Sequence, residues 1–407
     1  MRTAPDRGRL GYLLSKYPSA NHTYLLREVR SLRDAGLDVV VIAVDGDDRP
    51  EHVIPPEDRD ERARTFVVKR RGVGEILAAH AATVITRPLK YAGGLAKAVS
   101  LAGPDLARLA SYLFYFGEAV VAGRQFWRQG CAHVHTHYAT NVAVLAACVY
   151  PVELSATIHG SAEFIDPRAQ RLREKVAACA FVRAISLYGR SQLMLATPFN
   201  EWSKFVVARL GVDPAEFAPA PFRPAAAPFR VTAVGQLQPA KGFHLLLEVV
   251  ASLVGDGRDV TLTLVGDGAD RGPLEAHAAR LGIGQRVTFT GALDPMGVRA
   301  VLHETDAFVL SSFAEGIPVV LMEAMASELA CVASRITGIP ELIDDGREGL
   351  LVTPSDERAL GGALGALMDD PALRRQLGRA ARVKICREYD LRGNLSPLAD
   401  LFAARIR

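Results

Sequence analysis

The strongest constraint on this sequence is a repeated alternation of short, unbroken apolar runs with segments of helical pattern. The second half predicts strands at Arg230–Gly235, Thr261–Val265, Arg286–Thr290, Ala307–Leu310, Ala330–Ser334 and Gly349–Val352. Helices are expected between them, at His244–Gly255, Gly272–Leu281, Met296–Glu304, Val319–Ser327, Ile339–Asp344 and Glu357–Met368. Apolar runs of this kind are typical of strands buried on both faces, and repeated strand–helix units require a doubly wound parallel sheet. The fold class is therefore α/β.

The first half begins with the same pattern. Strands are expected at Leu10–Leu14, Val39–Val44, His133–His135, Ala156–Ile158 and Phe181–Ile185. An amphipathic helix is expected from Thr23 to Ala35, which makes a strand–helix–strand unit with the two strands around it. The polar stretch Asp45–Arg64 indicates a loop, and Val73–Arg128 indicates a series of helices.

The length indicates two domains, since 407 residues exceed what one ordinary core holds. The Pro- and Ala-rich segment 211–228 has no periodicity and predicts the linker. We therefore expect Rossmann-like domains at 1–210 and 229–385, with a C-terminal helix at 386–407 that packs back on the first domain. Ligands of such sheets bind at the carboxyl ends of the strands, so the functional site is expected in the cleft between the domains.

Charge is distributed unevenly along the chain. A 49% hydrophobic composition excludes a disordered protein, and the net charge of +3 argues against a dedicated nucleic-acid binder. Residues 1–207 hold 27 Lys and Arg against 20 Asp and Glu, which is +7, and the rest hold 21 against 25, which is −4. The window 62–128 holds 11 against 3, which is +8. Basic and apolar residues alternate there, as on an anionic membrane surface. A solvated helical face packed on the core is the alternative.

The compartment signals indicate the cytoplasm. The five cysteines are far apart and form no C-x-x-C pair, which is typical of reduced, buried thiols. The N-terminus shows no signal-peptide pattern, and no run approaches the ~18 apolar residues of a membrane span. We therefore expect a cytoplasmic protein, peripheral on the inner face of the cell membrane if the basic window binds lipid.

The segment Leu310–Ala326, LSSFAEGIPVVLMEAMA, carries the most chemical information. Glu315 precedes an expected helix and Glu323 lies inside it. The backbone N–H groups of Val319 and Val320 are unpaired at the helix start, where they can bind an anion. Carboxylates accept hydrogen bonds from sugar hydroxyls, so the segment suits a ligand with both phosphate and hydroxyl groups. The alternative makes both glutamates ordinary solvated charges.

In order along the chain, several motifs resemble those of the retaining glycosyltransferases of family 4, which have the GT-B fold. In the second half these are VGQLQPAKG (234–242), LVGDG (264–268), RVTFTG (286–291), the two glutamates eight positions apart, and TGIPE (337–341). In the first half they are HVHTHYA (133–139), TIHG (157–160) and AIS (184–186). The opening Tyr17–Leu25 resembles a subgroup that builds exopolysaccharides, of the colanic-acid type.

The resemblance implies roles for individual residues. Glu315 would bind hydroxyls of the donor sugar, Glu323 the ribose hydroxyls, and Lys241 the diphosphate, while His159 would reach the transferred sugar. Catalytic roles are therefore expected for His159, Glu315 and Lys241. Donor binding is expected from Gln236, Lys241, Gly266, Gly316, Ile317, Val319, Val320 and Glu323. The donor is a nucleotide-diphosphate sugar, and the resemblance implies neither a cofactor nor a metal.

Some positions depart from the family pattern. Gln236 replaces an arginine that grips the diphosphate, so it brings no charge. Ala162 replaces an aspartate two residues after the glycine of TIHG, and residues 20–25 read ANHTYL where the family has S-E-T-F-I. These changes affect expectations about the sugar and the acceptor more than those about the donor site.

Two other patterns suggest a metal and are interpreted otherwise. Asp45-Gly46-Asp47 has the D-x-D form of a different glycosyltransferase fold, but it lies in an acid-rich stretch and is expected to be a solvated loop. His133, His135 and His137 alternate and would share one face of a strand. No carboxylate or cysteine partner is evident for them, so we expect a structural or acceptor-facing role.

The function expected is therefore metal-independent, retaining transfer of a sugar to a saccharide or polyprenyl-linked acceptor in cell-surface polysaccharide biosynthesis. A nucleotide-sugar epimerase of GT-B fold shares the donor site and stays an alternative. A non-catalytic sugar-binding protein is the alternative from another class. A dinucleotide oxidoreductase is disfavoured because Leu14–Ala20 lacks G-x-G-x-x-G after the first strand.

Overall fold

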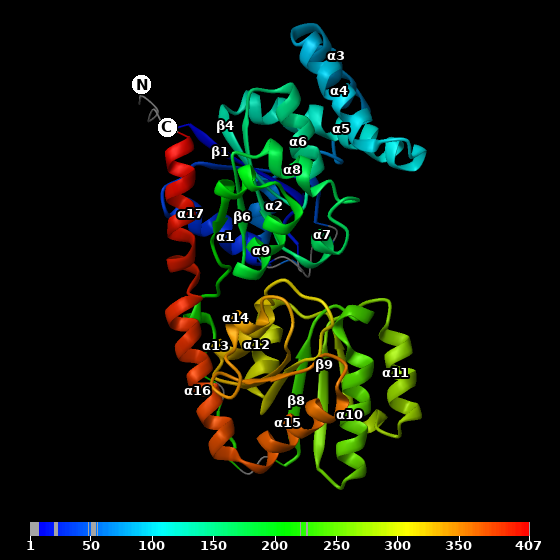
Figure 1. The fold of residues 1–407 in the computed structure, drawn as a ribbon, viewed down its shortest axis with the longest axis vertical. Coiled ribbons are helices and arrows are strands. Elements are labelled where there is room, and N and C mark those ends of the chain that lie inside the picture. The colour runs from blue at the N-terminus through cyan, green and yellow to red at the C-terminus, as the bar shows by residue number, and fades with distance from the viewer. Residues whose placement is uncertain are drawn as a thin grey trace. The chain divides into compact units, whose positions relative to one another are not determined.

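The computed structural model describes residues 8–19, 23–47, 49, 54, 56–219, 221–224 and 227–406. It has the expected α/β class and divides into two compact units (Figure 1). The first unit comprises Met1–Ile185, Gly189–Ala208 and Leu395–Arg407, and the second comprises Ser186–Tyr188 and Arg209–Asn394. No helix in the described part of the chain combines the length and the apolar character that crossing a membrane requires.

A seven-stranded parallel sheet, ordered β3-β2-β1-β4-β5-β6-β7, forms the centre of the first unit. Its strands are β1 (Arg9–Lys16), β2 (Val39–Asp45), β3 (Phe66–Val67), β4 (Cys131–His137), β5 (Glu153–Ile158), β6 (Phe181–Ala184) and β7 (Phe205–Val207). Its helices are α1 (Thr23–Asp34), α2 (Pro56–Arg64), α3 (Val73–Thr86), α4 (Pro88–Ala102), α5 (Leu106–Arg128), α6 (Thr140–Val149), α7 (Ser161–Ile165), α8 (Leu172–Ala178) and most of α9 (Leu187–Ala196) and α17 (Leu391–Arg405).

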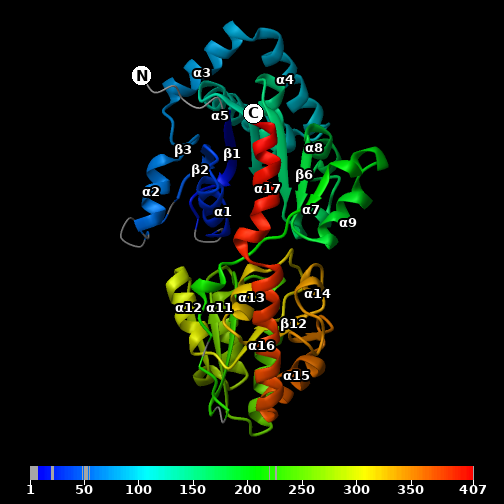
Figure 2. The same ribbon diagram turned by 90° about the vertical axis from the view of Figure 1, so that its left-hand side faces the viewer.

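The second unit holds a six-stranded parallel sheet in the order β10-β9-β8-β11-β12-β13, with helices on both faces (Figures 1 and 2). The strands are β8 (Phe229–Val234), β9 (Val260–Val265), β10 (Val287–Gly291), β11 (Ala307–Leu310), β12 (Ala330–Ser334) and β13 (Leu350–Val352). The helices are α10 (Phe243–Gly255), α11 (Arg271–Arg280), α12 (Pro295–His303), α13 (Val319–Ala326), α14 (Ile339–Leu342), α15 (Glu357–Asp369) and α16 (Pro371–Glu388).

Each sheet supports a core of its own. In the first unit α4, α5 and α6 pack together beside the sheet, through residues such as Phe116, Val120 and Leu145. The other face of β4 carries the alternating histidines, and Phe402 of α17 lies 5.0 Å from the ring of His135. In the second unit the core joins the strands to α10 and α15. Burial of these apolar side chains stabilises the fold by about 25 cal/mol per Å² of surface removed from water.

The stretch Asp45–Arg64 is not only a loop, because Pro56–Arg64 forms helix α2. Its polar sequence concealed the helix, which is held by ion pairs instead of an apolar stripe. Arg49 Nη2 lies 2.6 Å from Asp58 Oδ2 and 2.7 Å from Asp47 Oδ2. Asp47 is only 1% exposed, so the expectation of a solvated loop is wrong for this residue. Its carboxylate is occupied by an arginine, as expected of a structural group and not of a metal ligand.

The Pro/Ala-rich segment that composition marks as a linker is grouped with the second unit over its described part. Val212 forms a parallel bridge with Asp390, and the carbonyl of Phe217 accepts a hydrogen bond of 2.6 Å from Arg382 Nη1. Beyond α16 the chain continues into α17, most of which belongs to the first unit. There Arg405 Nη1 lies 2.7 Å from Glu153 Oε1.

Candidate functional site

The strand order of the second sheet reverses between β8 and β11. Strands β9 and β10 continue from β8 to one side, whereas β12 and β13 continue from β11 to the other. The loops after β8 and β11 therefore leave the sheet in opposite directions, and a crevice for ligands forms at such a point. Lys241 follows β8 and Glu315 follows β11, so the topology alone brings them to one place.

Lys241 and Glu315 are in direct contact. Lys241 Nζ lies 2.6 Å from Glu315 Oε1, and the same oxygen accepts a 2.6 Å hydrogen bond from Ser312 Oγ. Both charged side chains are largely buried, and Ser312 is fully buried. A carboxylate held by an ammonium and a hydroxyl is fixed in orientation, and its second oxygen has lone pairs for ligand hydroxyls.

The backbone around Lys241 is held in place by Ser311. Its Oγ donates to the carbonyls of Lys241 at 3.0 Å and of Gly242 at 3.2 Å. Gly242 has φ 64°, and a Cβ there would lie 2.3 Å from the Ser311 carbonyl oxygen. Glycine is therefore required after the lysine, both for the left-handed backbone and for the close approach of the β11 loop.

The loops after β8 and β9 also meet backbone to backbone. Gly266 has φ 138°, and a Cβ on it would lie 1.9 Å from the carbonyl oxygen of Gly235. Gly235 N donates to Val265 O at 2.9 Å, and Leu237 N donates to Asp267 O at 3.0 Å. Close packing at the carboxyl edge of the sheet thus requires Gly266 of LVGDG, independently of any ligand.

Helix α13 follows Glu315 and begins after Pro318, which provides no side-chain cap. The N–H groups of Val319 and Val320 are at its first turn, where the helix dipole favours negative charge. Glu323 lies one turn further and is buried. The turn before the helix packs on the TGIPE segment, because Gly316 O accepts from Gly338 N and from Thr337 Oγ1, both at 3.3 Å. Ile317 is buried beside Gly338.

The second unit therefore assembles all the residues expected to bind the donor. Gln236 is exposed in the loop after β8, Gly266 follows β9, and the others lie between β11 and the second turn of α13, apart from Lys241. The arrangement offers one cation, two carboxylates and a helix N-terminus at one edge of a sheet. Such a set can bind an anionic group beside a polyhydroxyl group.

His159, the remaining predicted residue, belongs to the first unit. It follows β5 and is buried, and its ring stacks on Tyr138 with 4.4 Å between the centroids. Its Nε2 atom lies 2.8 Å from Nδ1 of His137, the last residue of β4. Tyr138 has φ 62°, a left-handed conformation rare for a tyrosine, and its hydroxyl lies 2.6 Å from that of Tyr24.

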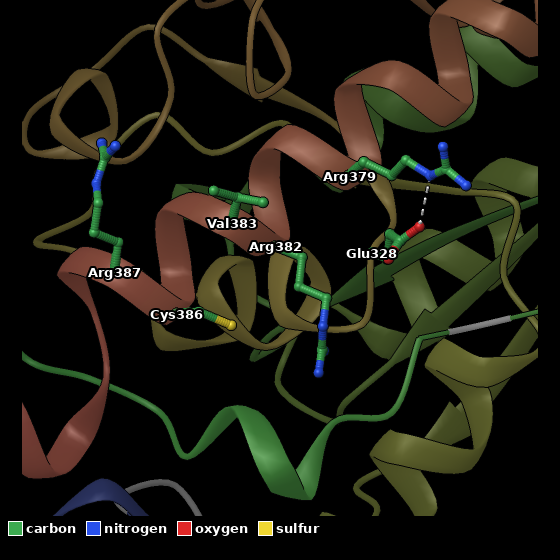
Figure 3. A pocket seen from close by; sticks show the side chains of 6 residues that line it. All are labelled: Glu328, Arg379, Arg382, Val383, Cys386 and Arg387. Atoms are coloured by element: carbon green, nitrogen blue, oxygen red, sulfur yellow. Dashed lines mark ion pairs between the residues drawn. The ribbon is translucent and has the colours of Figure 1, made fainter.

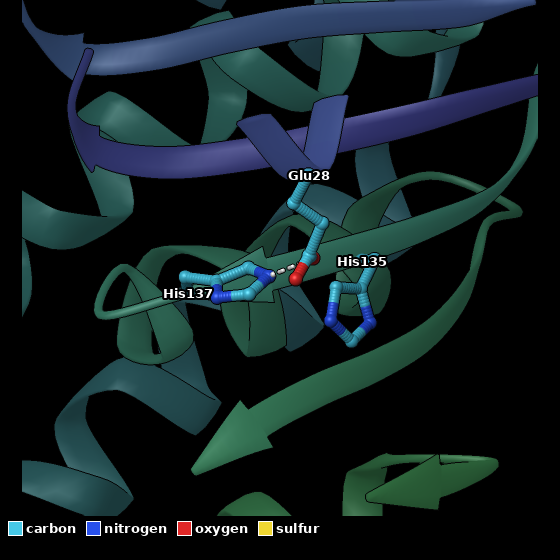
Figure 4. Close-up of side chains that lie close together, drawn as sticks. All are labelled: Glu28, His135 and His137. Atoms are coloured by element: carbon cyan, nitrogen blue, oxygen red, sulfur yellow. Dashed lines mark ion pairs between the residues drawn. The ribbon is translucent and has the colours of Figure 1, made fainter. Parts of the chain in front are cut away.

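The histidines of β4 do have a carboxylate partner, which the sequence analysis did not anticipate. Glu28 of α1 lies 3.1 Å from Nε2 of His137, and the ligand atoms of Glu28, His135 and His137 lie within 4.8 Å of one another (Figure 4). Glu28 and His135 have hydrogen-bond partners, however, whereas His137 Nε2 has none among the described residues. His135 bonds to Ser155 and Thr157 at 2.7 and 2.8 Å.

A buried arginine further disfavours a cation at this group. Arg183 Nη1 lies 2.5 Å from Glu28 Oε2, and the arginine side chain is fully buried. A metal ion there would face a second positive charge that no solvent screens. The group is therefore better described as a hydrogen-bonded network than as a metal site. His133 likewise bonds to Glu153 at 2.8 Å and to Ser155 at 2.6 Å.

A separate hollow of about 580 Å³ lies beside α16 in the second unit (Figure 3). It is lined by Glu328, Arg379, Arg382, Val383, Cys386 and Arg387. Its arginines have structural partners: Arg382 donates to the carbonyls of Phe217 and Ala326, and Arg379 pairs with Glu328 at 3.5 Å. This hollow contains none of the predicted site residues.

Four side chains around the predicted residues were not found from the sequence. Ser311 and Ser312 gave a weak signal, as two hydroxyls directly after a buried strand. Glu28 gave a clearer one, because it lies on the apolar face of α1 with Leu25 and Leu32. A charge on that face requires a buried partner. That partner, Arg183, is 155 residues away, and nothing in the sequence connects the two.

Comparisons with known proteins bear on the family and the fold. Residues 217–384 match the family described as glycosyl transferases group 1. A glycogen synthase of Mycobacterium tuberculosis is 28% identical over 69% of this chain and 70% of its own length. The Escherichia coli K12 protein named as colanic acid biosynthesis glycosyltransferase WcaL is 25% identical over 88% of this chain and 90% of its own.

Among solved structures, Anabaena Alr3699/HepE in complex with UDP and glucose superposes with a TM-score of 0.73. It covers 98% of this chain and 100% of its own, at 18% identity, which is a likeness of fold. The family match lies over the sheet and loops that carry Lys241 and Glu315, and the E. coli relative extends over both units. Together with the two parallel sheets, these matches assign residues 217–384 to the glycosyl transferases group 1 and the whole chain to the GT-B fold.

Proposed function

We propose that the protein is a retaining glycosyltransferase, which moves a sugar from a nucleotide-diphosphate sugar to a saccharide or polyprenyl-linked acceptor in cell-surface polysaccharide biosynthesis. The observation that carries this proposal is the contact between Lys241 and Glu315 at the reversal point of the second sheet. A cation next to a carboxylate matches the two ends of such a donor. The colanic acid name of the E. coli relative supports the class of product.

The donor's leaving group is a nucleoside diphosphate. Lys241 supplies a compact positive charge to it, and the N–H groups of Val319 and Val320 supply the positive end of a helix dipole. These groups stabilise the charge that develops as the bond between the sugar and the diphosphate breaks. Gln236 can add a hydrogen bond but no charge, so Lys241 contributes more to stabilising the leaving group. The UDP bound to Anabaena HepE supports a nucleotide of this kind.

The remaining residues orient the sugar and the ribose. Glu315 accepts from hydroxyls of the donor sugar, Glu323 from those of the ribose, and His159 contacts the transferred sugar. The hydroxyl oxygen of the acceptor bonds to C1 on the face that the diphosphate leaves, and the hydroxyl proton passes to the departing phosphate oxygen. No carboxylate nucleophile is required, and the configuration at C1 is retained. Lys241 takes the place of a metal ion, so chelation should leave activity unchanged.

A donor panel tests this proposal. UDP-, GDP- and ADP-glucose are added to the purified protein, and the matching donor should stabilise it by about 2.7 kcal/mol at a concentration 100 times its Kd. Glu315→Gln should bind the same donor more weakly. With a synthetic polyprenyl-diphosphate-linked disaccharide as acceptor, NMR of the product then shows transfer with retention, in EDTA as without it.

Other outcomes identify the alternatives. An isomerised donor without transfer would indicate an epimerase. A stabilising free sugar, with no effect of any nucleotide, would indicate a sugar-binding protein. Equal stabilisation of wild type and Glu315→Gln would remove Glu315 from the donor site.

We further propose that helices α3, α4 and α5 of the first unit rest on an anionic membrane surface. Large apolar side chains are exposed along them, among them Ile85 at 78%, Leu89 at 87% and Leu106 at 81%. The window 62–128, which includes these helices, has a net charge of +8. Apolar side chains that enter the lipid boundary, beside Lys and Arg worth about 1 kcal/mol each near anionic headgroups, form a peripheral anchor.

Liposome co-sedimentation tests this surface. We expect binding to vesicles that contain phosphatidylglycerol and weaker binding as salt increases, because the Debye length shortens. The double variant Ile85→Asp/Leu89→Asp should remain in the supernatant, and it should fold normally because both side chains are exposed. Val383→Asp, at a 62% exposed position on α16, is the matched control and should bind like wild type. Absence of binding at low salt would contradict the proposal.

A further inference from the structure

A chain of buried polar contacts connects Arg183 to His159 through three elements of the first unit. Arg183 Nη1 lies 2.5 Å from Glu28 Oε2, Glu28 Oε1 lies 3.1 Å from His137 Nε2, and His137 Nδ1 lies 2.8 Å from His159 Nε2. Figure 4 shows the Glu28 carboxylate directed at the His137 ring. All four residues are buried. Among the described residues His137 Nε2 has no aligned hydrogen-bond partner, so its 3.1 Å contact with the Glu28 carboxylate is an ion-pair contact.

The protonation states follow from the surroundings. Burial acts to raise the pKa of Glu28, but the charge of Arg183 and the contact with His137 outweigh it and hold that pKa well below its ordinary value. Burial lowers the pKa of His137, against the opposing effect of Glu28. Near neutral pH the network therefore contains an ionised carboxylate and a neutral imidazole, which has one N–H and one lone pair.

The position of that single proton is then determined. An ionised carboxylate only accepts hydrogen bonds, so His137 directs its N–H from Nε2 toward Glu28. Its Nδ1 atom keeps the lone pair and accepts from the neighbouring ring. His159 must therefore carry its proton on Nε2, and when neutral it has its lone pair on Nδ1.

We propose that Glu28 and His137 are positioning residues that fix the tautomer of His159, so that Nδ1 accepts a hydrogen bond from a hydroxyl of the transferred sugar. The proposal deepens, and rests on, the role proposed for His159 in transfer. Stacking on Tyr138 holds the ring plane, and the Glu28–His137 pair decides which nitrogen donates. Whether the His159 ring accepts a hydrogen bond from a sugar hydroxyl is thus determined by Glu28, which reaches His159 only through His137.

Substitution of Glu28 by glutamine should reverse the positions of the protons on His137 and His159. In Glu28→Gln the amide oxygen must face Arg183, because a guanidinium only donates. The amide N–H₂ then faces His137 Nε2, which has to accept. His137 becomes protonated on Nδ1, and His159 must accept at Nε2 and carry its proton on Nδ1. Both rings therefore change tautomer together.

The first experiment is NMR of the full chain labelled with ¹⁵N-histidine, with resonances assigned by His159→Gln and His137→Gln. We expect His159 to be protonated at Nε2 in wild type, with a coupling across the hydrogen bond to His137 Nδ1. Glu28→Gln should move the proton to Nδ1 in both rings. Tyr12→Phe is the matched control: it removes the 2.9 Å hydrogen bond from Tyr12 to Glu28 but keeps the charge, so the tautomers should not change.

Kinetics gives a second readout. Glu28→Gln should lower kcat by about tenfold, the effect of one ordinary hydrogen bond, and should add no further loss to His159→Gln. Wild-type His159 protonated at Nδ1, or a folded Glu28→Gln with the wild-type tautomers, would overturn the proposal. If Glu28→Gln does not fold, the coupling between the two rings in wild type decides: its absence overturns the proposal. The NMR result needs no substrate, so it fails independently of the transferase function.

Discussion

Replacing Lys241 with methionine is expected to lower kcat for sugar transfer by about 10²–10³, the usual cost of removing one group that stabilises developing charge. Methionine keeps an unbranched apolar stem but carries no charge. The stem matters, because it packs against Gly235 of the same loop, where a Cβ would lie 3.3 Å from Cε of Lys241. The variant therefore tests the ammonium group and not the packing.

The distribution of the loss between kcat and KM shows what the ammonium does. A charge that acts mainly on the departing diphosphate should lower kcat more than it raises KM for the donor. Initial rates at varied donor concentration separate these effects. Lys204→Met is the matched control, since Lys204 lies in the first unit and pairs with Glu201 at 2.6 Å. A Lys241→Met enzyme with wild-type kcat would contradict the assignment of the lysine to the leaving group.

Because Lys241 is paired with Glu315, its substitution has a second consequence. The glutamate loses its cation and keeps only the 2.6 Å hydrogen bond from Ser312. A buried carboxylate without its partner is destabilised. A Lys241→Met/Glu315→Gln double variant should therefore be more stable to heat than Lys241→Met alone, although both should transfer sugar far more slowly than wild type.

The strands of the second unit were predictable almost to the residue. Ala307–Leu310 and Ala330–Ser334 agree with the structure at both ends, and Thr261–Val265 differs by one residue. These strands are buried on both faces, so an unbroken apolar run marks their length directly. In the first unit β4 extends over Cys131–His137, whereas only His133–His135 was expected, because its polar side chains interrupt the apolar pattern.

What the sequence could not reveal are the partners of buried charges. Helix α2 was interpreted as loop because its charges seemed to belong in water, yet Asp58 and Glu61 are buried. Glu61 accepts from Tyr17 at 3.0 Å and pairs with Arg33, and both partners lie far away in the sequence. Periodicity describes which face of an element is apolar. It does not describe which distant cation will neutralise a charge on that face.

The candidate site was predictable for a different reason. The residues of the donor site follow strand ends in an order that resembles a known family, and the topology then brings β8 and β11 together. The support around them was not predictable, since Ser311 holds the Lys241 backbone and Glu28 approaches His137 only in the folded chain. Motifs thus identify the groups that meet the ligand, whereas the structure identifies the groups that hold them.

Glu118→Gln is expected to make the first unit more stable at pH 8 and to change little at pH 5. Glu118 of α5 is 6% exposed, and among the described residues its Oε1 atom has no hydrogen-bond partner. Burial raises its pKa to about 7, against the opposing charge of Lys69. At pH 8 the folded protein must hold a buried carboxylate ion, which the neutral glutamine avoids.

The direction in which stability changes with pH follows from proton binding. Between the ordinary glutamate pKa and about 7 the folded state binds this proton and the unfolded state does not. Wild-type stability should therefore fall as the pH rises through that window and level off above it, with a total loss of about 3 kcal/mol. Glu118→Gln removes that fall. Both tryptophans, Trp127 and Trp202, belong to the first unit, so denaturant unfolding followed by tryptophan fluorescence reports on this unit.

The exposed Glu75→Gln on α3 is the matched control and should parallel wild type at both pH values. Equal stabilities of wild type and Glu118→Gln at pH 8 would mean that the carboxylate is solvated when ionised. The expected result would instead mean that Glu118 of α5, in the proposed membrane surface, is a neutral carboxylic acid below about pH 7 and a buried ion above it. Near anionic lipid the local pH is lower than in bulk solution, which favours the protonated form. The helix that carries Phe114 and Leu106 to the lipid should then be more stable when bound than when free, so vesicles should protect wild type from unfolding at pH 8 more than they protect Glu118→Gln.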